Sequence, residues 1–139
     1  MTRKDAVLLE EDRLQSSATV PPPLHERHRA FPAVFENRPH RRVLDVAAGV
    51  GYAGERIQAA HPARLVCNDI APTCLESLRA RHLTALSYSI DEAQAGFPFA
   101  AGSFDAVIAL ATIEHVLQLD EFVTEIHRIL APEGCFYVS

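Results

Sequence analysis

The sequence has no tryptophan, one methionine and only three cysteines among its 139 residues. The cysteines, at positions 67, 74 and 135, are odd in number and lack CxxC spacing, which argues against a zinc site or a disulfide framework. No apolar run approaches the ~20 residues that a membrane-spanning helix needs, and no apolar signal-peptide stretch follows the N-terminus. We therefore expect a cytoplasmic protein that has no membrane partner.

Positive charge is scarce over most of the chain. Residues 43–139 carry 5 basic and 12 acidic side chains, a net charge of -7. Nucleic-acid binding needs clustered basic residues, and the one such cluster, residues 38–42, is better explained as a solvated entrance to a strand. His25 and His28 have metal-ligand spacing but no third ligand. The expected partners therefore include neither nucleic acid nor a metal ion.

From residue 42 onward, short apolar runs alternate with helical stretches. This alternation predicts right-handed βαβ units around a parallel sheet, that is, an α/β fold over residues 41–139. Residues 1–40 are predicted to form a separate helical segment or lid, with short helices over residues 5–14 and 24–37. We predict strands over residues 43–46, 65–67, 86–90, 104–110 and 135–138, and helices over residues 52–60, 72–82 and 119–130.

A glycine-rich stretch, residues 45–54, follows the first predicted strand and opens the first helix of the α/β region. Gly49 and Gly51 permit a tight turn and let a ligand approach the backbone without a Cβ in the way. The helix start behind them offers free N–H groups to a carboxylate or phosphate. The context predicts a ligand site, with a purely structural turn as the alternative.

Asp69 stands twenty residues after Gly49, at the end of the second predicted strand. An acid at this place can accept hydrogen bonds from both hydroxyls of a ribose. The alternative is a cap for the helix predicted from residue 72, and the two roles are compatible. The spacing Gly49-x-Gly51-x-x-Gly54 also matches the dinucleotide fingerprint, so an NAD-binding domain is a competing interpretation. Asp45, which stands inside the strand, weighs against it.

Four downstream segments decide between these cofactors. Residues 97–99 (FPF), 103–107 (SFDAV), 113–116 (IEHV) and 125–134 (EIHRILAPEG) resemble, in order, successive signatures of class I S-adenosylmethionine-dependent methyltransferases of the small-molecule branch. The resemblance covers residues 41–139 and implies a Rossmann-like, doubly wound sheet of strand order 3-2-1-4-5. Relatives normally add two further strands, so we expect the last two strands to be lacking and self-association through the edge of strand five.

The resemblance implies S-adenosyl-L-methionine as the cofactor. The first motif would hold its methionine end, Asp69 its ribose, and Asp91 the adenine amino group, with Ser89 as a rival. The backbone at Leu110 and Ala111 would lie near the methionine moiety. One departure is visible, because the family usually has glycine where Ala47 stands. The expected cofactor-binding residues are Asp45, Ala47, Gly49, Gly51, Asp69, Ile70, Asp91 and Leu110.

The implied activity is methyl transfer to a small-molecule acceptor. A general base is needed only for a protonated nucleophile, and His115 is the candidate because imidazole titrates near neutral pH. The acceptor, and the atom that receives the methyl group, are not specified by these residues. The alternative function is a non-catalytic cofactor-binding fragment or an interaction module. Separate measurements of cofactor binding and of turnover distinguish the two.

Overall fold

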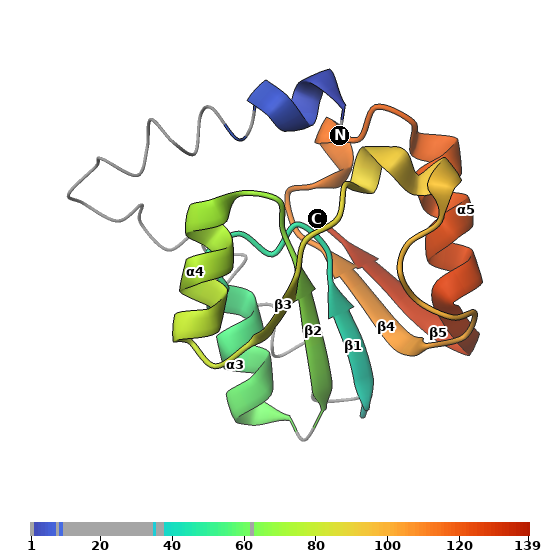
Figure 1. The fold of residues 1–139 in the computed structure, drawn as a ribbon. Coiled ribbons are helices and arrows are strands. Elements are labelled where there is room, and N and C mark those ends of the chain that lie inside the picture. The colour runs from blue at the N-terminus through green and yellow to red at the C-terminus, as the bar shows by residue number, and fades with distance from the viewer. Residues whose placement is uncertain (1, 8, 10–34, 36–37, 62) are drawn as a thin grey trace.

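A computed structural model describes residues 2–7, 9, 35, 38–61 and 63–139. Its five strands form one parallel sheet of order β3-β2-β1-β4-β5 (Figure 1). This order confirms the predicted Rossmann-like fold, and β3 and β5 are the edge strands of the sheet. The strands are β1 (Arg42–Asp45), β2 (Arg64–Asn68), β3 (Thr84–Leu86), β4 (Phe104–Ala109) and β5 (Leu130–Val138).

The helices follow the strands as the alternation predicted. Those described are α3 (Tyr52–Ala60), α4 (Pro72–Ala80), α5 (Leu119–Ile129) and the 3-10 helices η1 (Ile90–Ala95) and η2 (Ile113–His115). A further short helix covers residues 3–7, and we call it the N-terminal helix. The helix predicted at 24–37, and most of the one predicted at 5–14, fall outside the described residues. In the part of the chain that is described, no helix has the length and apolar character to span a bilayer.

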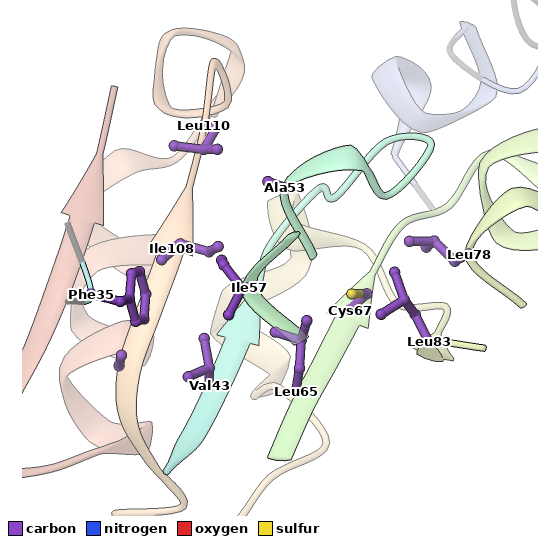
Figure 2. Packing of buried hydrophobic residues seen from close by; sticks show 11 residues of the cluster. Phe35, Val43, Ala53, Ile57, Leu65, Cys67, Leu78, Leu83, Ile108 and Leu110 are labelled. Carbon is purple, nitrogen blue, oxygen red and sulfur yellow. The ribbon is translucent and has the colours of Figure 1, made fainter. Parts of the chain in front are cut away.

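Side chains alternate between the two faces of the sheet, and each face is covered by helices. Val43 packs with Ile57 of α3 and Leu78 of α4 on one face (Figure 2). Its neighbour Leu44 points to the opposite face, where Phe122 belongs to α5. All five side chains are almost fully buried. Burial on both faces explains why the central strands are continuous apolar runs in the sequence.

The third strand lies earlier than predicted. The apolar run at residues 86–90 predicted it there, but β3 covers Thr84–Leu86 and Ile90 already begins η1. The side-chain amide of the buried Asn68 donates to the carbonyl oxygen of Tyr88 at 2.9 Å. A side chain of β2 thus takes the place of a ladder partner, and the parallel pairing stops at Leu86.

The fifth strand begins five residues earlier than predicted. Its register against β4 shifts between Phe104, which pairs with Leu130, and Ala106, which pairs with Cys135. Between these two pairs, residues 131–134 depart from the regular strand ladder, and Glu133 among them has a φ of 64°. A Cβ at Gly134 would lie 2.8 Å from the carbonyl oxygen of Ala131, so this tight course requires glycine.

A charged pair on α5 fixes the turn that follows η1. Glu125 accepts the backbone N–H of Phe97 at 2.7 Å, and Arg128 donates to the carbonyl oxygen of Phe99 at 2.8 Å. The two side chains also bind each other. Hydrogen bonds from Arg128 hold the pKa of Glu125 below its usual value. The η1 segment, which carries Asp91, is thereby tied to the helix layer.

Candidate functional site

A cavity of about 790 Å³ opens at the carboxyl ends of the strands. In Figure 1 this is the upper end of the sheet, toward which the arrows point, and the blue N-terminal helix lies above it. In the sheet, β2 pairs with one edge of β1 and β4 pairs with its other edge. The cavity lies at this switch point of the strand order, which is where ligands bind in open α/β sheets. The walls include Ala47, Asn68, Asp69, Ile70 and His115.

The loop after β1 has an unusual backbone. Ala47, Gly49 and Gly51 have φ values of 52°, 60° and 90°. Space for a Cβ is open at Gly49, whereas a Cβ at Gly51 would lie 2.7 Å from Cδ2 of Leu78. A side chain at Gly51 would therefore collide with α4, a packing constraint that the sequence analysis did not consider, and the close approach of a ligand to Gly51 stays a prediction. At Ala47, where the family usually has glycine, the left-handed backbone carries a cost of roughly 1 kcal/mol.

Asp69 joins this loop to the next helix. Its carboxylate accepts the backbone N–H of Gly49 at 2.8 Å and that of Ala71 at 2.9 Å. The second bond lies directly before α4, so the capping role considered from the sequence is present. A carboxylate has about four acceptor positions, and two backbone bonds do not saturate it. Asp69 is partly exposed on the cavity wall, where it can also contact a ligand.

Asp45 lies beneath the loop and is 2% exposed. Burial, and secondarily the charge of Asp69, raise the pKa of Asp45 to about 8. Its Oδ2 has no hydrogen-bond partner within the described ranges. A buried carboxyl oxygen without a partner is costly, and an ammonium group would satisfy it. Asp45 thus has the character of a ligand contact rather than of a structural one.

The two candidates for the adenine contact point to different partners. Asp91 is 3% exposed, and its Oδ1 accepts the backbone N–H of Leu117 at 2.8 Å. Its Oδ2 forms an ion pair with Lys4 at 2.9 Å. The hydroxyl of Ser89 donates to Asp5 at 2.6 Å. Both therefore face the N-terminal helix, a neighbour that the sequence analysis did not assign to either.

The end of β4 contributes backbone rather than side chains. Leu110 is 8% exposed and belongs to the core, whereas Ala111 and Thr112 reach the cavity. The positive φ of Ala111, 52°, turns the chain toward the cavity. His115 is exposed on η2 and lines the cavity together with Glu114. The structure thus brings His115 to the same cavity as Ala47, Asp69 and Ile70.

Lys4 and Asn68 line the cavity, and the sequence analysis did not select them. Asn68 is 1% exposed, and its side chain connects the end of β2 to the segment after β3. A polar residue at the end of an apolar strand was the available signal. Nothing in the sequence near Lys4 indicates its contact with Asp91, because 86 residues lie between them.

A family model for the methyltransferase domain matches residues 44–138. The chain belongs to the class I S-adenosylmethionine-dependent methyltransferases. Among curated relatives, the chain is 32% identical over 114 residues to a demethylmenaquinone methyltransferase of Thermus thermophilus, covering 80% of this chain and 51% of that protein. It is 35% identical over 104 residues to a ubiquinone biosynthesis O-methyltransferase of Methylocella silvestris, covering 70% and 39%.

Solved structures share the fold of this chain. A Haloferax volcanii methyltransferase in complex with the Trm112 methyltransferase activator has a TM-score of 0.71 at 23% identity, covering 99% of this chain and 60% of that one. Phosphoethanolamine N-methyltransferase 2 of Haemonchus contortus, in complex with S-adenosyl-L-methionine, has a TM-score of 0.69 at 19% identity, covering 96% and 32%. The chain spans about half the length, or less, of the curated relatives named above.

Proposed function

We propose that this chain binds S-adenosyl-L-methionine in the cavity at the carboxyl ends of β1, β2 and β4 and moves its methyl group to a small-molecule acceptor. The observation that carries the proposal is the pair of acids under and beside the glycine loop. Asp45 is buried beneath the loop with an unpartnered oxygen, and Asp69 reaches the wall of the cavity. An amino-acid ammonium and a ribose diol are the groups that complement these two carboxyls.

The residues present fit this cofactor. A cavity of about 790 Å³ lies within the roughly 300–1,000 Å³ that small-molecule sites occupy. Asp45 would hold the ammonium group and Asp69 the ribose hydroxyls. Ile70 offers an apolar surface to adenine on one wall, and Tyr88 and Ile90 line the wall that follows β3. The backbone of Ala111 would pass along the methionine moiety.

When bound, the cofactor supplies a methyl group that its positively charged sulfur has already activated. The chain's own contribution is then to hold donor and acceptor in line, which can supply up to about 7–11 kcal/mol in ideal cases. His115 would accept a proton from an acceptor hydroxyl, for which its place on the cavity wall is suitable. An acceptor whose nucleophile carries no proton would not need it.

The relatives support a small-molecule acceptor, because their names specify demethylmenaquinone and ubiquinone biosynthesis. The alternative is a cofactor-binding module without turnover. In that case the acceptor site would be completed by further chain or by a protein partner. The proposal for the cofactor is the same in both cases.

Calorimetry tests the proposed function. S-adenosylhomocysteine should bind to the protein and raise its melting temperature, whereas NAD and NADP should do neither. Stabilisation by a nicotinamide cofactor alone would refute the assignment. A methyl-transfer assay with quinone precursors then separates enzyme from module, because only the enzyme consumes the methyl donor.

A further inference from the structure

The side chain of Asn68 connects two segments that line the cavity, the loop after β1 and the segment after β3. Its Nδ2 donates to the carbonyl oxygen of Tyr88 at 2.9 Å and lies 3.5 Å from that of Leu86. Its Oδ1 lies 3.5 Å from the backbone nitrogen of Ala47. Two carbonyl oxygens at Nδ2 and an N–H at Oδ1 define the orientation of the amide. The bond to Tyr88 is the shortest of these contacts.

Tyr88 lies at the boundary of two cavities. It lines the cavity of about 790 Å³ and also a second cavity of about 200 Å³, whose walls include Ser87 and Ser89. Its ring packs against Phe97, with ring centroids 5.0 Å apart. Its hydroxyl is buried and has no hydrogen-bond partner in the part of the chain that is described. The bond from Asn68 to its carbonyl oxygen therefore anchors this residue through the backbone.

The sheet ladder ends before it reaches Tyr88. The pairing of β2 with β3 stops at Asn68 and Leu86, and the N–H of Asp69 donates to the carbonyl oxygen of Leu86 at 3.2 Å. Past this point the chain turns into η1, which begins at Ile90. Without the Asn68 donor, the carbonyl oxygen of Tyr88 would lose this partner, and a polar group left unpaired favours movement toward water.

We propose that Asn68 is a positioning residue that limits the base site to the size of adenine: by binding the carbonyl oxygen of Tyr88, it holds the wall between the cofactor cavity and the second cavity. The inference rests on the proposed function, in which Ile70 and the wall after β3 border the adenine. While Tyr88 is held, the second cavity is closed to the base. Without the bond Tyr88 moves, the two cavities merge, and a purine with a larger substituent fits.

The test compares S-adenosylhomocysteine with its analogue that carries a benzyl group on the adenine 6-amino nitrogen. Calorimetry should show that the wild type prefers the unmodified ligand by about tenfold or more. Asn68→Leu has a similar volume but no donor, and it should lower this preference by roughly tenfold, the scale of one hydrogen bond. Thr84→Val is the control, because it removes a polar group at the other end of β3 and should keep the wild-type preference.

Two further variants guard against a folding defect in Asn68→Leu. Asn68→Asp keeps the shape of the side chain and the oxygen that faces Ala47, and it replaces only the donor that faces Tyr88. At pH 9 the introduced carboxyl should be ionised, even with the burial that raises the pKa of Asp45 to about 8. Asn68→Asp should then lower the preference as Asn68→Leu does. Tyr88→Leu should lower it as well, because it shortens the wall itself.

The double variant decides whether the two residues act together. In the Tyr88→Leu background, Asn68→Leu should lower the preference no further, because both changes act on the same wall. Additive losses would overturn the inference. A wild-type preference in any folded variant of Asn68 or Tyr88 would also overturn it, and so would equal loss of affinity for both ligands, which indicates a purely structural bond.

The wild type separates this inference from the proposed function. If it binds both ligands equally well, the cofactor assignment stands and the positioning role is wrong. If the folded wild type binds neither ligand, the cofactor assignment is wrong and the positioning role is refuted with it.

Discussion

Replacement of Asp45 by asparagine should stabilise this protein, and the gain should increase with pH. The carboxyl is buried beneath the glycine loop with an unpartnered Oδ2, and its pKa is raised from 3.8 to about 8. The folded state therefore holds this proton more tightly than the unfolded state does. Wild-type stability falls as the pH rises through that window, whereas the side-chain amide of the Asp45→Asn variant does not titrate.

The magnitude follows from proton linkage. Between pH 4 and pH 8, the folded state binds one proton more than the unfolded state. The free energy of unfolding of the wild type therefore falls by about 1.4 kcal/mol for each pH unit. From pH 5 to pH 7 the stability difference between Asp45→Asn and the wild type should therefore grow by about 3 kcal/mol in favour of the variant. Below pH 4 the two proteins should differ little through this group, because the carboxyl is then protonated in both states.

Urea unfolding at pH 5, 6 and 7, followed by circular dichroism, measures this difference. Glu76→Gln on the exposed face of α4 is the control, and it should follow the wild type at each pH. A pH-independent difference for Asp45→Asn would refute the reasoning. The variant should also bind S-adenosylhomocysteine more weakly, by about 1.5–3 kcal/mol, because an amide cannot pair with an ammonium group as a carboxylate does.

Further substitutions test the loop, the acid and the sheet edge. Gly51→Ala should lower the free energy of unfolding by about 1–3 kcal/mol, because its Cβ would meet Leu78. Gly49→Ala should cost less, because a Cβ at Gly49 faces open space. Thermal melting of the two variants measures this order. Asp69→Ala should lower the melting temperature and also weaken cofactor binding by about 1.5–3 kcal/mol; unchanged affinity in a folded variant would leave Asp69 as a helix cap alone. We expect self-association through β5, where Val138 is 47% exposed, so Val138→Lys should shift sedimentation toward the monomer; a monomeric wild type would contradict this.

The sequence predicted the parts of the fold in which local pattern and tertiary packing agree. Helix α3 has the predicted bounds, and β1, β2 and β4 lie within two residues of theirs, because apolar runs buried on both faces are distinct. The β3 prediction was wrong because the side chain of Asn68, rather than hydrophobicity, ends the pairing. The early start of β5 was missed because an irregular register incorporates Pro132, a residue that normally marks the end of an element.

The candidate site could be predicted where it depends on one short motif. Asp45 and Asp69 were selected because Asp45 ends β1 and Asp69 directly follows β2, and their ligand contacts stay predictions. The reason for Gly51 was missed, since only the packing of Leu78 shows where a Cβ would point. Lys4 was missed for a similar reason, because its partner Asp91 is distant in the sequence and no local pattern indicates that the fold brings the two together.

The contacts of the N-terminal helix determine when the cavity can be completed during folding. The bond between Asp5 and Ser89 joins residues 84 positions apart, and the bond from Lys4 to His115 joins residues 111 positions apart. Contacts between residues so far apart in the sequence form slowly. On a ribosome the helix would emerge before η2 and could dock only after η2 has formed. Until that moment one wall of the cavity would be open to solvent.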